Sequence, residues 1–187
     1  MKKTVAVIGS RGAIGNAVVD TLLADESVEA VFKFSRAEIT EHDDKVKHIF
    51  IDIEDEESIK QATESLPEDT KFDLIFVATG ILHDEKNVFP EKSIKDISFD
   101  KLIKVLTINT IGPTLVGKYF IPYLRKDSKS TFAFLSARVG SISDNKLGGW
   151  YSYRASKTAL NQIIRNFSIE VARSNKNAIF VLSLIHI

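Results

Sequence analysis

The chain has 187 residues, of which 44% are hydrophobic and 27% are charged, and this length and composition are typical of one domain with a sizeable core. Its 25 basic and 25 acidic residues give a net charge of zero, which argues against a nucleic-acid or anionic-membrane partner. The chain has no cysteine, so disulfides, thiolate catalysis and cysteine-ligated zinc are excluded.

The first apolar run follows Met1-Lys2-Lys3 and ends at Gly9, which is too short for the core of a secretion signal. No later stretch reaches the ~20 apolar residues of a membrane helix. We therefore expect a soluble, cytoplasmic protein without a membrane partner. The four histidines are scattered without metal-ligand spacing, so no metal site is predicted.

Short apolar runs alternate with longer amphipathic stretches. The apolar runs predict strands at residues 4–8, 28–34, 46–51, 72–78, 131–136 and 178–184. Apolar residues at helical spacing predict helices at residues 16–24, 56–65, 99–124 and 153–173, the third interrupted at Gly112-Pro113. The polar stretches 37–45 and 83–98 are predicted loops, and the second lies where a loop could cover a ligand.

Strand followed by helix, repeated along the chain, predicts a parallel sheet with helices on both faces. We therefore expect a Rossmann-type, doubly wound α/β fold. No second domain or repeat is visible, so residues 1–187 are interpreted as a single dinucleotide-binding domain.

A glycine-rich turn joins the first predicted strand to the first predicted helix. Gly9 would permit the tight turn, Gly12 would let the backbone approach a pyrophosphate, and Gly15 would let the helix pack closely on the strand. The helix N-terminus then offers free N–H groups to the phosphates. The strand-turn-helix context favours a dinucleotide site over a purely structural turn. The residues expected at the cofactor also include Ser10, Arg11 and Ile14.

The end of the second predicted strand bears on the choice of cofactor. NAD sites usually carry an acidic residue there, which holds the ribose 2′-hydroxyl. This chain has Ser35-Arg36 instead, and a guanidinium suits the 2′-phosphate of NADP. Arg11 could add a second positive charge. The sequence thus favours NADP(H) over NAD(H), the alternative being that both arginines are solvated surface residues.

Tyr153 and Lys157 lie four residues apart, which places them on one face of the last predicted helix. A nearby ammonium lowers the pKa of a phenol, and the phenol could then give a proton to a carbonyl oxygen while a nicotinamide delivers hydride. The spacing alone is common by chance, but downstream of a dinucleotide turn it gains meaning.

The chain resembles the short-chain dehydrogenase/reductase family over residues 4–184, and within it the branch of the sniffer-type carbonyl reductases and the C-signal protein. The resemblance is carried by the glycine turn and by two stretches, Leu-Ser-Ala-Arg-Val-Gly-Ser-Ile at 135–142 and Gly-Gly-Trp-Tyr-Ser-Tyr-Arg-Ala-Ser-Lys-Thr-Ala-Leu-Asn at 148–161. The glycine turn departs slightly from the family, because its first two glycines are separated by two residues instead of the usual three.

The resemblance implies roles for further residues. Tyr153 would be the proton donor, and Lys157 would lower its pKa and hold the nicotinamide ribose. Asn109 would anchor a proton-relay water. Positions implied to line the cofactor are Asp52 and Ile53 after the third strand, and Ala78, Thr79 and Gly80 after the fourth.

The catalytic serine departs from the family pattern. Ala137 stands three residues before Gly140, where the family has its serine, and Ser136 is adjacent. Side chains alternate along a strand, so Ser136 points the wrong way unless the turn redirects it. Ser136 is nevertheless the predicted substitute.

The resemblance implies an NADPH-dependent oxidoreductase that reduces a small-molecule aldehyde or ketone. The alternative is a non-catalytic dinucleotide-binding or signalling protein on the same fold. Family members continue beyond the last predicted strand into a substrate-covering segment, so we expect a chain truncated at the C-terminus rather than a naturally shorter protein. The two long helices commonly form the subunit interface in this family, which implies a homodimer or homotetramer; some members of this branch are monomers, and the sequence leaves that alternative open.

Overall fold

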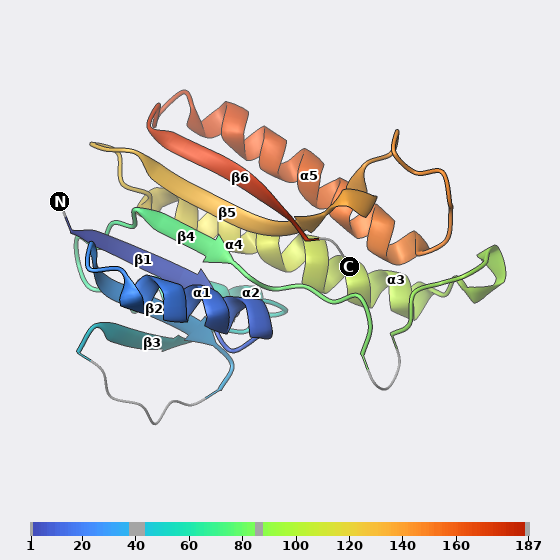
Figure 1. Cartoon of the computed structure of the whole chain (residues 1–187), viewed down its shortest axis with the longest axis horizontal. Helices are drawn as coiled ribbons and strands as arrows, with labels where there is room; N and C mark the ends of the chain where they lie inside the picture. Colours follow the sequence, from blue (N-terminus) through green and yellow to red (C-terminus); the bar gives the residue numbers. More distant parts are fainter. Residues whose placement is uncertain (1, 38–43, 85–87, 186–187) are drawn as a thin grey trace.

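The computed structural model describes residues 2–37, 44–84 and 88–185, and its centre is one six-stranded parallel sheet in the order β3-β2-β1-β4-β5-β6 (Figure 1). This order is that of a Rossmann-type doubly wound fold, so the predicted fold class is confirmed. The strands are β1 (Lys3–Ile8), β2 (Val28–Ser35), β3 (Val46–Phe50), β4 (Leu74–Val77), β5 (Ser130–Ala137) and β6 (Ala178–Ile185).

The helices follow the predicted positions closely. They are α1 (Ala13–Ala24), α2 (Glu56–Glu64), α3 (Phe99–Leu106), α4 (Gly112–Phe120) and α5 (Tyr151–Val171). Local chemistry explains some starts: the Asp55 carboxylate accepts the Glu57 N–H at 3.0 Å at the start of α2, and Ser98 caps α3. Short 3₁₀ turns lie at Ile94–Asp96, Ile121–Tyr123 and Arg138–Gly140.

The single helical pattern expected over residues 99–124 divides into three parts. A π-helical segment, Thr107–Ile111, separates α3 from α4, and the 3₁₀ turn follows α4. The sequence predicts that the helical pattern breaks at Gly112-Pro113, but the structure has the irregularity one turn earlier, in the π-helical segment Thr107–Ile111. Pro113 stands in the first turn of α4, a position where a helix tolerates proline, which has no N–H.

The two sheet faces are buried unequally. Ala6 and Ile8 of β1 join a large core under α2, α4 and α5, whereas Val5 and Val7 join a smaller core under α1. Alternate residues of one strand thus enter opposite cores, which explains why the strand sequences are continuously apolar. Figure 1 shows α1 crossing the near face of the sheet over β1 and β2.

The predicted loops lie partly outside the described residues, which omit 38–43 and 85–87. All six strands are parallel, so their carboxyl ends meet at one edge of the sheet. In Figure 1 this edge lies toward α3 and the first turn of α5. The carboxyl edge of such a sheet is where ligands bind in this fold.

Candidate active site and dinucleotide cavity

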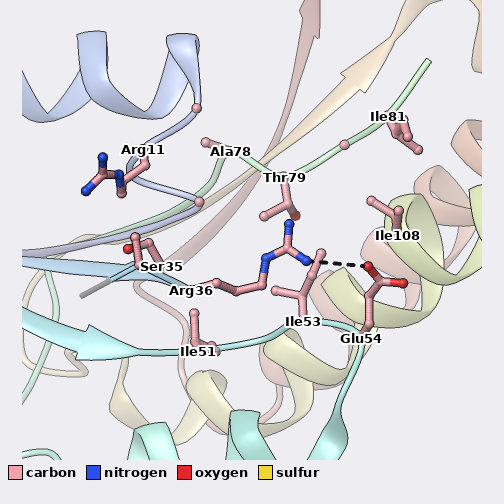
Figure 2. Close-up of a pocket in the computed structure, with 14 residues that line it drawn as sticks. Arg11, Ser35, Arg36, Ile51, Ile53, Glu54, Ala78, Thr79, Ile81 and Ile108 are labelled. Atoms are coloured by element: carbon pink, nitrogen blue, oxygen red, sulfur yellow. Dashed lines mark ion pairs between the residues drawn. The ribbon is translucent and has the colours of Figure 1, made fainter. Parts of the chain in front are cut away.

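A cavity of about 500 Å³ opens at the carboxyl ends of β1, β2 and β4. Most residues predicted at the cofactor line it: Gly9, Arg11, Gly12, Ser35, Arg36, Ile53, Ala78, Thr79 and Gly80. Five lining residues were missed: Ala37, Ile51, Glu54, Ile81 and Ile108. Figure 2 shows Arg11 at one end of the cavity and Ile108 at the other.

The glycine turn has the tight geometry that its sequence predicts. Gly9 adopts φ +80°, a conformation that favours glycine, and its carbonyl accepts the Gly12 N–H at 3.1 Å. A Cβ on Gly15 would lie 2.2 Å from the Gly9 oxygen, so Gly15 allows α1 to pack on the turn. A Cβ on Gly12 would meet only that oxygen, at 3.5 Å, so the protein itself leaves space beside Gly12.

Not every predicted cofactor residue faces the cavity. Ser10 is fully buried and its hydroxyl donates to the Phe34 carbonyl at 3.3 Å. Ile14 lies on α1 and is partly exposed. The Asp52 carboxylate accepts the Glu54 N–H at 3.0 Å. These three residues, together with Gly15, Tyr153 and Lys157, are not among those that line the cavity.

Two hydroxyls in the cavity wall have no hydrogen-bond partner among the described residues. They are Ser35 Oγ and Thr79 Oγ1, both buried. A buried unpaired hydroxyl costs free energy, and a bound polyhydroxylated or phosphorylated ligand would remove that cost. The cavity wall therefore fits a dinucleotide.

Three charged side chains, two of them in the cavity wall, form a chain. Arg36 is well exposed, and its guanidinium lies 3.9 Å from the Glu54 carboxylate (Figure 2). Lys104, on α3, contacts the other Glu54 oxygen at 2.7 Å. Because Glu54 is shared between two cations and is nearer to Lys104, the charge of Arg36 is only partly compensated.

Asn109, Lys157 and Gly80 meet next to this cavity. A Cβ on Gly80 would lie 3.3 Å from Lys157 Nζ and 3.4 Å from Asn109 Oδ1. Asn109 is fully buried in the π-helical segment, where its amide accepts the Ile81 N–H at 2.7 Å and donates to the Ile81 carbonyl at 2.8 Å. The widened turn thus ties Asn109 to the chain that follows β4.

The same amide also reaches α5. Asn109 Nδ2 donates to Ser156 Oγ at 3.1 Å, and Ser156 Oγ donates to the Tyr153 carbonyl at 2.8 Å. Lys157 Nζ donates to the Leu135 carbonyl at 2.9 Å. Residues that are far apart in sequence are therefore held together at the carboxyl edge by buried hydrogen bonds.

The ionisation of Tyr153 differs from the sequence-based expectation. Burial raises the pKa of Tyr153, whereas the neighbouring ammonium was expected to lower it. Burial also lowers the pKa of Lys157 to about 8, and Lys157 Nζ lies 5.8 Å from the Tyr153 ring centroid. Desolvation disfavours the charged form of each group, which explains why the two pKa values move in opposite directions.

Ser136 points toward α5. It is buried, and its hydroxyl donates to Asn161 Oδ1 at 2.6 Å. Asn161 is eight residues beyond Tyr153, about 12 Å along the helix axis at 1.5 Å per residue. The turn after β5 does not redirect Ser136, and the strand alternation noted in the sequence holds.

Ala137 instead borders a separate hollow beside β6. Ser141, Ser143 and Asn161 also line that hollow. Ser141 Oγ and Ser143 Oγ are 3.4 Å apart. Both hydroxyls therefore lie on the same side of the molecule as the position where the family carries its serine.

Among the described residues, no helix is long and apolar enough to cross a membrane. The same residues contain no cluster of three or more histidine, aspartate or glutamate side chains that could hold a metal ion.

The sheet order and the cavity at its carboxyl edge define a nucleotide-binding type of α/β fold. The model of the short chain dehydrogenase family matches residues 3–184. The chain therefore belongs to that family, and family membership, predicted from the motifs, is confirmed. Members of this family bind a nicotinamide dinucleotide.

Two relatives illustrate how far the similarity extends. The C-signal protein of Myxococcus xanthus is 33% identical over 94 residues, which cover 50% of this chain and 54% of that protein. The 1-hydroxy-2-glutathionyl-2-methyl-3-butene dehydrogenase of Rhodococcus sp. strain AD45 is 27% identical over 180 residues, which cover 95% of this chain and 75% of that protein. The chain thus matches only about half of the C-signal protein.

Solved structures share the fold. The NADPH-bound carbonyl reductase from chicken fatty liver superposes with a TM-score of 0.81 at 26% identity, covering 97% of this chain and 78% of that one. The carbonyl reductase Sniffer of Caenorhabditis elegans has a TM-score of 0.82 at 19% identity, covering 97% and 84% of the two chains.

Proposed function

We propose that this protein is an NADPH-dependent reductase of aldehydes or ketones, with Tyr153 as proton donor. The observation that carries the proposal is the meeting of Lys157 and Asn109 at Gly80, beside a cavity with two unpaired hydroxyls. A proton donor, a buried amine and a cavity of about 500 Å³ at one sheet edge suit carbonyl reduction by a bound cofactor.

Different residues of this chain would bind different parts of the cofactor. The Gly9–Gly15 turn and the N-terminus of α1 would hold the pyrophosphate, and Arg36, with Ser35, would hold the 2′-phosphate. Thr79 and Lys157 would bind ribose hydroxyls. The cofactor, when bound, supplies hydride to the carbonyl carbon.

Proton delivery would depend on Tyr153 and the buried network behind it. The Tyr153 phenol would protonate the carbonyl oxygen as charge develops there. Ribose hydroxyls beside Lys157 would give its amine hydrogen-bond partners, and the ammonium form of Lys157 would favour the tyrosinate left after transfer. Asn109 would keep its place through Ile81 and Ser156 and anchor the returning proton path.

A non-catalytic dinucleotide-binding protein is the second candidate, favoured by one observation. The position of the family's serine is Ala137, and the adjacent Ser136 donates its proton to Asn161. If Ser136, Ser141 and Ser143 all fail to reach the substrate, the carbonyl oxygen lacks one donor, and loss of such a donor costs ~10²-fold or more in rate.

The first experiment separates these candidates. NADPH and NADH are titrated separately, and stability is followed by thermal unfolding; NADPH at a hundredfold excess over its dissociation constant should stabilise by ~2.7 kcal/mol, and NADH by less. Arg36→Ala should remove the preference for NADPH. Arg165→Ala, an exposed arginine of α5 outside the cavity, is the control. No stabilisation of the folded chain by either dinucleotide would refute the proposal.

Turnover is tested with NADPH and a reactive aromatic aldehyde, 4-nitrobenzaldehyde. Tyr153→Phe should abolish turnover and leave NADPH binding intact, because the phenol donates its proton only during the reaction. Equal turnover by wild type and Tyr153→Phe would show that Tyr153 is not the acid. Tight NADPH binding without turnover by either protein would favour the non-catalytic candidate.

A further inference from the structure

The first turn of α5, which carries Tyr153, begins without the usual support. Its N-cap residue is Trp150, in a left-handed conformation with φ 52° and no side-chain cap, and the first turn contains no acidic residue. Gly148 and Gly149 before it also have positive φ angles. The free N–H groups at a helix start need acceptors, and here no residue of the helix supplies them.

Glu91 supplies them from a distant part of the chain. It is only 1% exposed, and its carboxylate accepts the Ser152 N–H at 3.3 Å and, in a short hydrogen bond, the Ser152 hydroxyl. Its backbone carbonyl accepts the Trp150 N–H. Glu91 therefore caps α5 in place of a local side chain.

The fit leaves little freedom at this contact. A Cβ on Gly149 would lie 3.2 Å from the Glu91 carbonyl oxygen, so the left-handed turn packs directly on the Glu91 backbone. Ser152 is buried as well. Among the described residues no lysine or arginine pairs with Glu91, so the helix N-terminus and Ser152 are what offset its charge.

We propose that Glu91 is a positioning residue: it fixes the first turn of α5, and thereby the Tyr153 phenol, against the segment 88–92. The role in catalysis rests on the proposed function, whereas the capping contact does not. Tyr153 directly follows Ser152, and its ring meets Trp150 edge to face at 6.2 Å between centroids. Ser152, which precedes Tyr153, and Trp150, whose ring contacts the Tyr153 ring, both form hydrogen bonds with Glu91.

The capping contact is tested by amide hydrogen exchange, which needs no substrate. Glu91→Ala removes both acceptors of the side chain, whereas Glu91→Gln keeps one acceptor and removes the charge. The control is Asn175→Ala, which deletes a buried side chain just beyond the other end of α5, where Asn175 donates to the Arg125 carbonyl at 3.0 Å.

Exchange in residues 150–157 should be at least ~10-fold faster in Glu91→Ala, because loss of a cap shifts the opening equilibrium by about that factor. Glu91→Gln should be intermediate, and Asn175→Ala should accelerate exchange only near residue 171. Equal protection of residues 150–157 in wild type and Glu91→Ala would overturn the proposal, because the contact would then not hold the turn.

The positioning role is tested with NADPH and 4-nitrobenzaldehyde. Glu91→Ala should lower kcat by ~10- to 100-fold, as misplacement of a catalytic group does, with the NADPH dissociation constant changed less than ~2-fold, and Glu91→Gln should lower kcat less. Asn175→Ala should leave kcat unchanged. Normal kcat in Glu91→Ala would overturn the positioning role. If Tyr153→Phe also keeps normal turnover, the proposed function fails instead, and hydrogen exchange still decides the cap.

Discussion

Lys157 is a buried amine whose only hydrogen-bond acceptor in the described residues is a backbone carbonyl, that of Leu135. No carboxylate of residues 2–37, 44–84 or 88–185 forms an ion pair with it, and its pKa falls to about 8 through burial. A buried amine of this kind lowers the stability of the folded protein, but its positive charge would attract an anionic cofactor. Its neighbour Tyr153, whose pKa burial raises, stays protonated and ready to donate at neutral pH.

The Lys157 pKa predicts how stability depends on pH. The folded protein releases this proton near pH 8, whereas the unfolded chain keeps it to about pH 10.5. Between these values the unfolded state binds more protons, so unfolding free energy should rise with pH. Lys157→Met should remove this rise and stabilise the protein at pH 7, measured by urea unfolding from pH 7 to 10.

Lys118 provides a control of opposite sign for that measurement. Hydrogen bonds to Glu56 and Tyr119 raise its pKa, so its stabilising contribution is present at neutral pH and is lost as pH rises through the folded pKa. Lys118→Met should therefore be neutral or slightly destabilising at pH 7. A Lys157→Met profile parallel to wild type would contradict the buried, depressed amine.

At the scale of elements, two glycines of the β1–α1 turn have different roles: Gly15 allows close packing of α1, and Gly12 leaves space beside the cavity. Gly15→Ala places a methyl group 2.2 Å from the Gly9 oxygen, so it should lower the unfolding free energy by about 1–3 kcal/mol, as overpacking does. Gly12→Ala has room for its methyl group beside the cavity. It should keep stability within ~1 kcal/mol and weaken NADPH binding at least ~10-fold.

Urea unfolding and NADPH titration of both variants check this separation. Gly12→Ala that binds NADPH normally would place the pyrophosphate elsewhere. Gly15→Ala with unchanged stability would mean that α1 shifts to relieve the contact. Gly117, which packs on Phe167 of α5, provides a control glycine on the opposite sheet face: Gly117→Ala should destabilise the fold and leave NADPH affinity unchanged.

The elements that could be predicted from sequence are those specified by local patterns. Strands and helices appear within a few residues of their predicted ends, and the glycine turn is specified by neighbours in sequence. The π-helical segment was missed because its cause is tertiary: Asn109 leaves the regular pattern to bond Ile81 and Ser156. Glu91 was missed as well, since a cap supplied across 61 residues gives no local signal.

The site shows the same division. Lining residues that follow strands β1, β2 and β4 were predicted, because strand ends converge at the carboxyl edge. Glu54, Ile81 and Ile108 were not, although each lies next to a residue that was named. Ser136 was named only because it is adjacent to Ala137, and its partner Asn161 comes from α5, which sequence spacing alone could not place beside it.

For the whole molecule, the sheet is covered unevenly. One cross-strand row on the α1 face runs from Val7 through Phe76 and Ala133 to Val181. Val7 is fully buried, whereas Val181 is 37% exposed and its neighbour Ile179, on the same face of β6, is 44% exposed. The helix α1 packs on β1 and β2. Among the described residues, it therefore covers this face of the sheet at β1 and β2 but not at β6.

The same substitution at the two ends of this row should therefore have different costs. Val7→Thr buries a hydroxyl among apolar side chains and should destabilise by about 1–3 kcal/mol. Val181→Thr keeps the β-branched shape on an exposed surface and should change stability by less than ~0.5 kcal/mol, while reducing self-association of an apolar edge strand. Urea unfolding gives the two costs, and light scattering gives the self-association. Equal costs would mean that another surface, such as a second copy, covers β6 in solution. In that case dilution should lower the cost of Val181→Thr but not that of Val7→Thr, because only the former would depend on an intermolecular contact.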